Sequence, residues 1–259
     1  MTDTAHTAPE GIQPFPAPQP PKLPALIRTT ALMSPETHAS QIKDAAGNLG
    51  NAEPAILGAL SAQRQMADAV AALERIRQTR NPADTAHNHL KKANDAYKTM
   101  LTTAANRHDM ARASVQSRLA QVETQINETL GLHESRDAAE IRTALRSMSK
   151  EDRSKAVEAA IQNKDGAILA AVFNSRELVT GIPENQRNSF RRRAEEMHAP
   201  ELLKLRVGLE KAGQLVSDAF DNLAEMESQV GAVGTAKSEL ERQVEAADNA
   251  WLAFNQAMQ

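Results

Sequence analysis

The chain has 259 residues, of which 41% are hydrophobic and only 3% aromatic, and its formal net charge is −3. It contains no cysteine, which excludes disulfides, thiolate-bound zinc and thiol nucleophiles. The nearly balanced charge gives no reason to expect a nucleic-acid or membrane-surface partner. Good helix formers such as Ala, Glu, Gln, Leu, Lys and Arg dominate, so the composition predicts an elongated, all-α protein.

The N-terminal ten residues, Met1 to Glu10, have neither the basic stretch nor the apolar stretch of a secretion signal. No apolar run in the chain reaches the roughly 20 residues that a membrane-spanning helix needs. We therefore expect no membrane span, and a cytoplasmic or virion-associated location.

Residues 1–33 are predicted to form a proline-rich, extended arm. Six prolines fall between residues 14 and 24, and proline supports polyproline II but neither a helix interior nor a sheet ladder. A disordered leader is the alternative that this composition leaves open. As an arm, the segment would bind a neighbouring subunit through four apolar side chains, Phe15, Leu23, Leu26 and Ile27.

Residues 34–81 are predicted to form two helices that pack at the base of a rod. Ser34 precedes a proline and has the chemistry of an N-cap, and Gly47 ends the first helix. The second helix opens near Pro54. It ends before Pro82, because proline disfavours the helical conformation of the residue that precedes it.

Residues 82–133 are predicted to form a long outgoing helix. Its apolar or small side chains recur in steps of three and four, which is the spacing of a coiled-coil seam. One repeated step of four is a stutter, which locally unwinds a supercoil. The seam comprises Tyr97, Leu101, Ala104, His108, Ala111, Val115, Leu119, Val122 and Ile126. We expect His108 to be a partly buried polar residue that helps to fix the register.

Residues 134–199 are predicted to form a small helical bundle, because short apolar stripes alternate there with explicit turn signals. Ser149 and Asp152 have the spacing of a capping box, with Asp in place of the usual Glu or Gln. His133 and His198 flank the bundle and are expected to be solvated.

Residues 200–259 are predicted to form a returning coiled-coil helix, since the apolar spacing alternates between four and three once Lys237 fills one position. Gly231, Gly234 and Lys237 are expected to weaken this helix locally. The main seam residues are Leu205, Leu209, Val216, Leu223, Val230, Leu240, Val244, Trp251 and Phe254. We expect Trp251 and Phe254 to pack in the core at the base of the rod. An exposed pair at a subunit interface is the alternative.

Together these segments predict an antiparallel coiled-coil hairpin with the small bundle at its tip. Residues 200–259 carry ten acidic and five basic side chains, whereas residues 82–133 carry five and six, which weakly favours pairing between the two helices over self-pairing. The expected register brings Tyr97 near Val244. A parallel oligomer through the C-terminal seam is the alternative.

The motifs that resemble chemical sites fit catalysis poorly. The glycine-containing stretch 231–238 lacks the spacing of a phosphate-binding loop, and no strand precedes it. His87 and His89 lie on different helix faces, the histidines form no ligand set, and no serine sits in a nucleophile elbow. We therefore expect no enzymatic activity, no cofactor and no metal.

The densest basic patch is a candidate phosphate contact, which comprises Arg187, Arg191, Arg192 and Arg193. The alternative is a solvated helix face on which these arginines pair with nearby glutamates. Aromatic stacking platforms are missing from the patch, so nucleic-acid binding is less favoured than protein binding.

The sequence thus favours a non-enzymatic structural or assembly protein that binds partner subunits through its arm and its rod. We expect a homo-oligomer or a larger assembly, such as a phage virion, connector or scaffold component. Secreted translocator-type proteins with hairpin coiled coils are a variant of this hypothesis. The alternative is a nucleic-acid-associated helical protein that uses the patch near Arg191.

Overall fold

The computed structural model describes residues 34–47, 52–79, 81–133, 135–231 and 233–258. Within these residues every regular element is α-helical, which confirms the all-α prediction. The arm predicted for residues 1–33 lies outside them. The helices are α1 (Pro35–Ala46), α2 (Pro54–Gln78), α3 (Ala86–Thr129), α4 (Ala138–Ser147), α5 (Lys150–Asn163), α6 (Gly166–Phe173), α7 (Glu177–Thr180), α8 (Glu184–His198), α9 (Pro200–Gly231) and α10 (Val233–Ala257).

Side-chain caps set several of these helix starts. The Thr85 hydroxyl accepts a hydrogen bond from the backbone amide three residues later at 3.2 Å, so α3 begins at Ala86 and not at Pro82. The Ser149 hydroxyl caps α5 in the same way, accepting from the Asp152 amide at 3.1 Å. The Ser149 hydroxyl also donates to the Asp152 carboxylate at 2.8 Å, so the two residues pair through their side chains.

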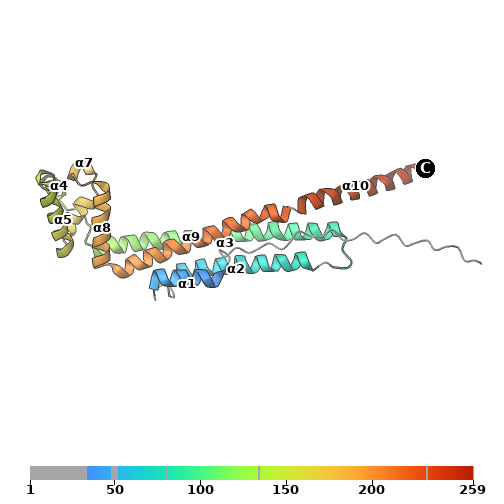
Figure 1. Cartoon of the computed structure of the whole chain (residues 1–259), viewed down its shortest axis with the longest axis horizontal. Coiled ribbons are helices and arrows are strands. Elements are labelled where there is room, and N and C mark those ends of the chain that lie inside the picture. Colours follow the sequence, from blue (N-terminus) through green and yellow to red (C-terminus); the bar gives the residue numbers. More distant parts are fainter. Residues whose placement is uncertain (1–33, 48–51, 80, 134, 232, 259) are drawn as a thin grey trace, which may run out of the picture.

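Helices α2, α3 and α9 pack together as a long rod (Figure 1). Helices α3 and α9 run in opposite directions. Tyr97, near the start of α3, bonds to the backbone of Leu223 near the end of α9, whereas Glu123, near the end of α3, pairs with Arg206 near the start of α9. Helices α4 to α8 form a head at one end of the rod. We call the other end, where α2 connects to α3, the base.

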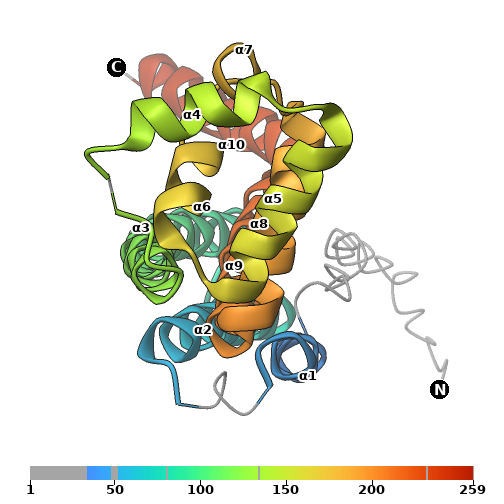
Figure 2. The same cartoon turned by 90° about the vertical axis from the view of Figure 1, so that its left-hand side faces the viewer.

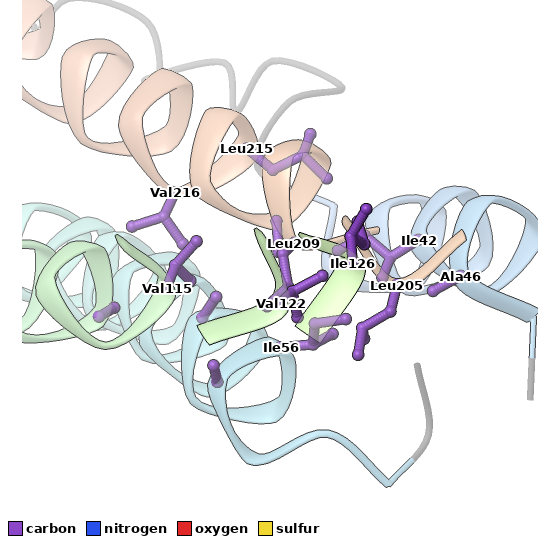
Figure 3. Packing of buried hydrophobic residues seen from close by; sticks show 14 of the residues in the cluster. Ile42, Ala46, Ile56, Val115, Val122, Ile126, Leu205, Leu209, Leu215 and Val216 are labelled. Carbon is purple, nitrogen blue, oxygen red and sulfur yellow. The ribbon is translucent and has the colours of Figure 1, made fainter. Parts of the chain in front are cut away.

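The core of the rod is a row of aliphatic side chains from α1, α2, α3 and α9 (Figure 3). Ile56 of α2, Val122 of α3 and Leu209 of α9 are completely buried. Full burial of a side chain of this size contributes about 1.5–3 kcal/mol. The α3 residues predicted as a seam are all buried or half-buried, so the periodicity identified the inward face of α3 correctly.

Helix α1 lies toward the head end of the rod, although the sequence predicted that residues 34–81 pack at the base. Ala46 of α1 and Ile56 of α2 both approach Gly208, which lies close to the start of α9. From there α2 runs toward the base (Figure 1). The reason is steric: Gly208 has no side chain, so α1 can approach α9 closely at this point.

The head is a small bundle around its own apolar residues (Figure 2). Its buried residues include Leu145, Val157, Ile161, Leu169, Val172, Ile182 and Phe190. Arg153 of α5 donates hydrogen bonds to the carbonyl oxygens of Leu145 at 2.7 Å and Met148 at 3.0 Å, and to that of Gly181. One guanidinium thus satisfies carbonyl groups that the C-terminal ends of α4 and α7 leave open.

The head meets the rod by close backbone contact. A Cβ on Gly166, at the start of α6, would collide with the carbonyl group of Gly131, which follows α3. Within the head, the His198 Nε2 atom lies 2.6 Å from the Ile161 carbonyl oxygen. His198 is therefore half-buried and bonded, so the prediction that it is solvated is wrong, whereas His133 is exposed.

The register of the two long helices differs from the expected one. The Tyr97 hydroxyl donates to the carbonyl oxygens of Leu223 at 3.1 Å and Ala224 at 3.2 Å, so Tyr97 does not lie near Val244. Leu223 precedes Val244 by three heptads. A register shifted by whole heptads keeps the same apolar face inward, which is why the spacing alone did not distinguish the two.

The close approach at Gly208 predicts the effect of a single methyl group. Gly208→Ala should destabilise the protein, because the new Cβ would press on Ala46 and lie 3.2 Å from its Cα. Overpacking costs about 1–3 kcal/mol, which outweighs the gain of up to about 1 kcal/mol from removing a helical glycine. Gly58→Ala is the matched control, since nothing lies within 4 Å of its Cβ position, and it should stabilise α2. Urea unfolding of both variants measures the difference, and equal stabilisation by both would contradict the packing.

Candidate interaction surface

The C-terminal helix α10 carries an apolar surface that no part of the described chain covers. It continues past the start of α3 (Figure 1). The exposed apolar side chains are Val244, Trp251, Leu252, Phe254 and Met258. Trp251 is 65% exposed and Phe254 is 53% exposed, and their rings stack with centroids 5.6 Å apart. Contiguous aromatic and aliphatic surface of this kind typically marks a binding site.

The C-terminal seam is therefore buried in its first half and exposed in its second. Leu205, Leu209, Val216, Leu223 and Val230 are buried, whereas Val244, Trp251 and Phe254 are not. The side chain of Leu240 lies outside those described. The prediction that Trp251 and Phe254 pack in the core is wrong, because α3 begins at Ala86 and leaves the part of α10 that carries them without a partner helix.

A shallow groove between α2 and α3 is a second apolar surface. Its volume is about 380 Å³, and only residues of α2 and α3 line it. Met66, Leu73 and Ala104 form a buried floor, while Ile76 and Thr99 are exposed at the rim. Most of the remaining lining residues are small, so another helix could approach the two backbones closely.

The arginines predicted to contact phosphate are all engaged within the chain. Arg187 donates to the Ser175 carbonyl oxygen, Arg192 pairs with Glu196 at 2.9 Å, and Arg193 pairs with Glu158 at 3.2 Å. Arg192 and Arg193 are exposed, and such surface pairs contribute only about 0–1 kcal/mol. The patch is thus close to the solvated, paired face that was the alternative interpretation.

Arg191 belongs to a more buried network at the junction of α3, α8 and α9. Glu195 is 2% exposed and accepts hydrogen bonds from Arg191 at 3.0 Å and from Arg206 at 2.6 Å. Glu123 of α3 contacts both guanidinium groups. The hydrogen bond to Glu195 is the main cause that raises the pKa of Arg206. Two carboxylates neutralise two guanidinium groups here, so the network holds helices together and leaves no net charge for a ligand.

Sequence reasoning did not identify Glu123 and Arg206. The usable signal was their position, since each directly follows a predicted seam residue, Val122 or Leu205, where interhelical ion pairs form.

His108 lies where it was predicted, on the inner face of α3, and its ring stacks on Phe220 with centroids 4.8 Å apart.

Three further predictions concern the N-terminal arm, metal binding and a membrane span. The arm residues Phe15, Leu23, Leu26 and Ile27 lie outside the described residues. Across the described part of the chain, His, Asp and Glu side chains form no group of three or more that could hold a metal ion. None of the helices searched in that part has both the length and the apolar composition needed to cross a membrane.

No protein-family model, no curated protein and no solved structure matches this chain. The surfaces and side chains described above are therefore the basis for inferring a function.

The network at the head junction predicts different effects for two adjacent glutamates. Glu195→Gln should lower the free energy of unfolding by about 1–3 kcal/mol, because it leaves Arg191 and Arg206 partly buried without their shared carboxylate. Glu196→Gln should change it by less than about 0.5 kcal/mol, since its pair with Arg192 is exposed. Chemical denaturation checks both values, and similar values for the two variants would argue against the network's role.

The contact between Tyr97 and α9 predicts a pH dependence. Burial, with a smaller contribution from Glu227, raises the pKa of Tyr97 above 10.0. The neutral phenol is thus favoured in the folded state, and its contribution to stability is present below pH 10 and lost as the pH rises through the folded pKa. Tyr97 is the only tyrosine, so phenolate absorbance reports it alone. Its titration midpoint should lie above 10 in the folded protein and return to about 10 in urea.

The control for this titration is Tyr97→Phe. It should abolish the absorbance change and cost about 0.5–1.5 kcal/mol for the lost hydrogen bonds. A folded-state midpoint at or below 10 would show that Tyr97 is solvated.

Proposed function

We propose that this protein is a non-enzymatic structural or assembly component that binds partner subunits, with α10 as its main binding element. The observation that carries this proposal is the exposed apolar face of α10, centred on the stacked Trp251 and Phe254. Trp and other large aromatic residues are the side chains that most often dominate binding energy at protein interfaces. A homo-oligomer or larger assembly, such as a phage virion, connector or scaffold component, is the setting that this proposal favours.

The rod in this proposal is an antiparallel coiled-coil hairpin that separates two functional ends. Support comes from the heptad spacing in both helices, and from the burial of Val115 and Val122 on α3 and of Val216 and Leu223 on α9. The head and α10 lie at opposite ends of this rod (Figure 1). The arm, with Phe15 and the apolar residues 23–27, would add a second contact to a neighbouring subunit.

Catalysis and nucleic-acid binding have less support. The polar cluster around Glu195 is neutralised by its own ion pairs, and the guanidinium of Arg153 bonds to carbonyl groups inside the head. Both clusters therefore stabilise the fold. The arginines of the candidate phosphate contact already have partners in the chain, so no observation favours the nucleic-acid alternative.

The proposal predicts that association depends on α10. Light scattering over a concentration series should give a molar mass above that of the 28.1 kDa chain. The double variant Trp251→Gln with Phe254→Gln should weaken association at least about tenfold, because removing one interface residue of this type often costs 2 kcal/mol or more. Trp251 is the only tryptophan, so its fluorescence should shift to the blue as the wild-type protein associates.

Leu178→Gln is the matched control, because Leu178 is an even more exposed apolar residue but lies in the head, on α7. It should leave association unchanged. A protein that stays monomeric at every concentration would contradict self-assembly through α10. If the double variant and the control weakened association equally, the cause would be the more polar surface in general and not the loss of the α10 contact.

A further inference from the structure

The exposed face of α10 is long enough to span the groove between α2 and α3. The groove is lined from Gln65 to Ile76 on α2 and from Ala96 to Arg107 on α3. The exposed apolar side chains in and just after α10 run from Val244 to Met258, which is 15 positions against 12 on each side of the groove. At 1.5 Å per residue, the groove is roughly 16 Å long, or about three helical turns, and the apolar face is roughly 20 Å long. The face of α10 is therefore long enough to cover the groove from end to end.

The α10 helix cannot reach the groove of its own chain. The groove lies at the level of Tyr97, and Tyr97 is bonded to residues 223 and 224 of α9. Trp251 follows Ala224 by 27 residues, which corresponds to a rise of roughly 40 Å at 1.5 Å per helical residue. Helix α10 also leaves the base in the direction away from the head (Figure 1). The occupant of the groove, if it is α10, comes from another copy.

A dimer with its twofold axis perpendicular to the rod would bury the apolar face of α10 and the α2–α3 groove of both copies. Two copies that meet base to base would carry each α10 onto the α2–α3 groove of the other copy. In that arrangement α10 runs parallel to α3 of the second copy and antiparallel to its α2. The interface is reciprocal and closed, which is the commonest symmetry of soluble homo-oligomers.

Charge supports pairing of α10 with α3 over pairing of α10 with itself. Helix α10 carries four acidic and two basic side chains. The part of α3 from its start to Arg107 carries four basic side chains and one acidic side chain. Among these, Glu245, Asp248 and Lys98 are exposed. Two α10 helices side by side would bring like charges together, which is unfavourable between paired helices.

We propose that α10 of one copy lies in the α2–α3 groove of a second copy, and reciprocally, so that the chain forms a base-to-base twofold dimer. This inference rests on the proposed function, because it requires α10 to be the element that associates. It adds the identity of the partner and the place where α10 binds: Trp251 and Phe254 lie between Ile76 and Met100 of the second copy.

The absence of cysteine makes this arrangement testable by site-directed crosslinking. One preparation carries Ala250→Cys, beside Trp251, and a second, differently tagged preparation carries Thr99→Cys on the rim of the groove. Thr102→Cys is the matched control. Thr99 and Thr102 are both exposed on α3 and make the same hydroxyl bond to the carbonyl group four residues earlier, but only Thr99 lines the groove.

After mixing and treatment with a short thiol-reactive crosslinker, Ala250→Cys should link to Thr99→Cys several-fold more than to Thr102→Cys. Addition of Trp251→Gln and Phe254→Gln to the first preparation should remove the product. Equal linkage to the two threonine positions would overturn the inference. So would trapping that appears only after deletion of residues 1–33, since the groove would then be occupied by the N-terminal segment.

Two outcomes separate this inference from the proposed function. If Ala250→Cys links only to itself while light scattering shows an oligomer, α10 pairs with α10, and the groove assignment fails while assembly through α10 stands. If light scattering shows a monomer at every concentration, both the groove assignment and assembly between copies fail together.

Discussion

The antiparallel packing of α3 against α9 is the constraint on which the rest of the structure depends. The two helices bring residues more than 100 positions apart into contact, such as Tyr97 with Leu223 and His108 with Ser217. Helices α1 and α2 make few contacts with each other, and they bury their apolar residues mainly on the surface that this pair provides. The pair also fixes the head at one end of the rod and sends α10 out at the other.

The heptad spacing predicted which face of each long helix is buried, but it left their register open. Apolar spacing repeats every seven residues, so a shift of α9 by one, two or three heptads buries an equivalent face. Side chains that do not repeat decide the register. They are the hydroxyl of Tyr97, which needs carbonyl partners, and the pair of Glu123 with Arg206 at the head junction. Gly208 adds a third constraint, because α1 fits only where α9 lacks a side chain.

Features that depend on neighbouring residues were easier to predict from the sequence than contacts between distant helices. The cap at Ser149 depends on a neighbour three residues away, and the sequence predicted it, whereas the cap at Thr85 follows the same rule but was not predicted. The burial of Glu195 depends on helices that lie far apart in the chain, and its two arginine partners include one, Arg206, that no local pattern singled out. The same limit applies to Trp251: its spacing is that of a core residue, and only the start of α3 at Ala86 shows that no helix lies opposite.

The unequal lengths of the paired helices explain why an apolar seam reaches the surface at all. Helix α3 has 44 residues, whereas α9 and α10 have 32 and 25, and the register starts α9 near the end of α3. The excess length therefore collects at the base, as a helix with one apolar face. Association through such a face can give either a closed dimer or an open chain of copies. A reciprocal twofold contact buries both overhanging α10 helices and stops at two copies. A head-to-tail contact would leave one α10 helix exposed at the end of the assembly, so further copies could add and form a fibre.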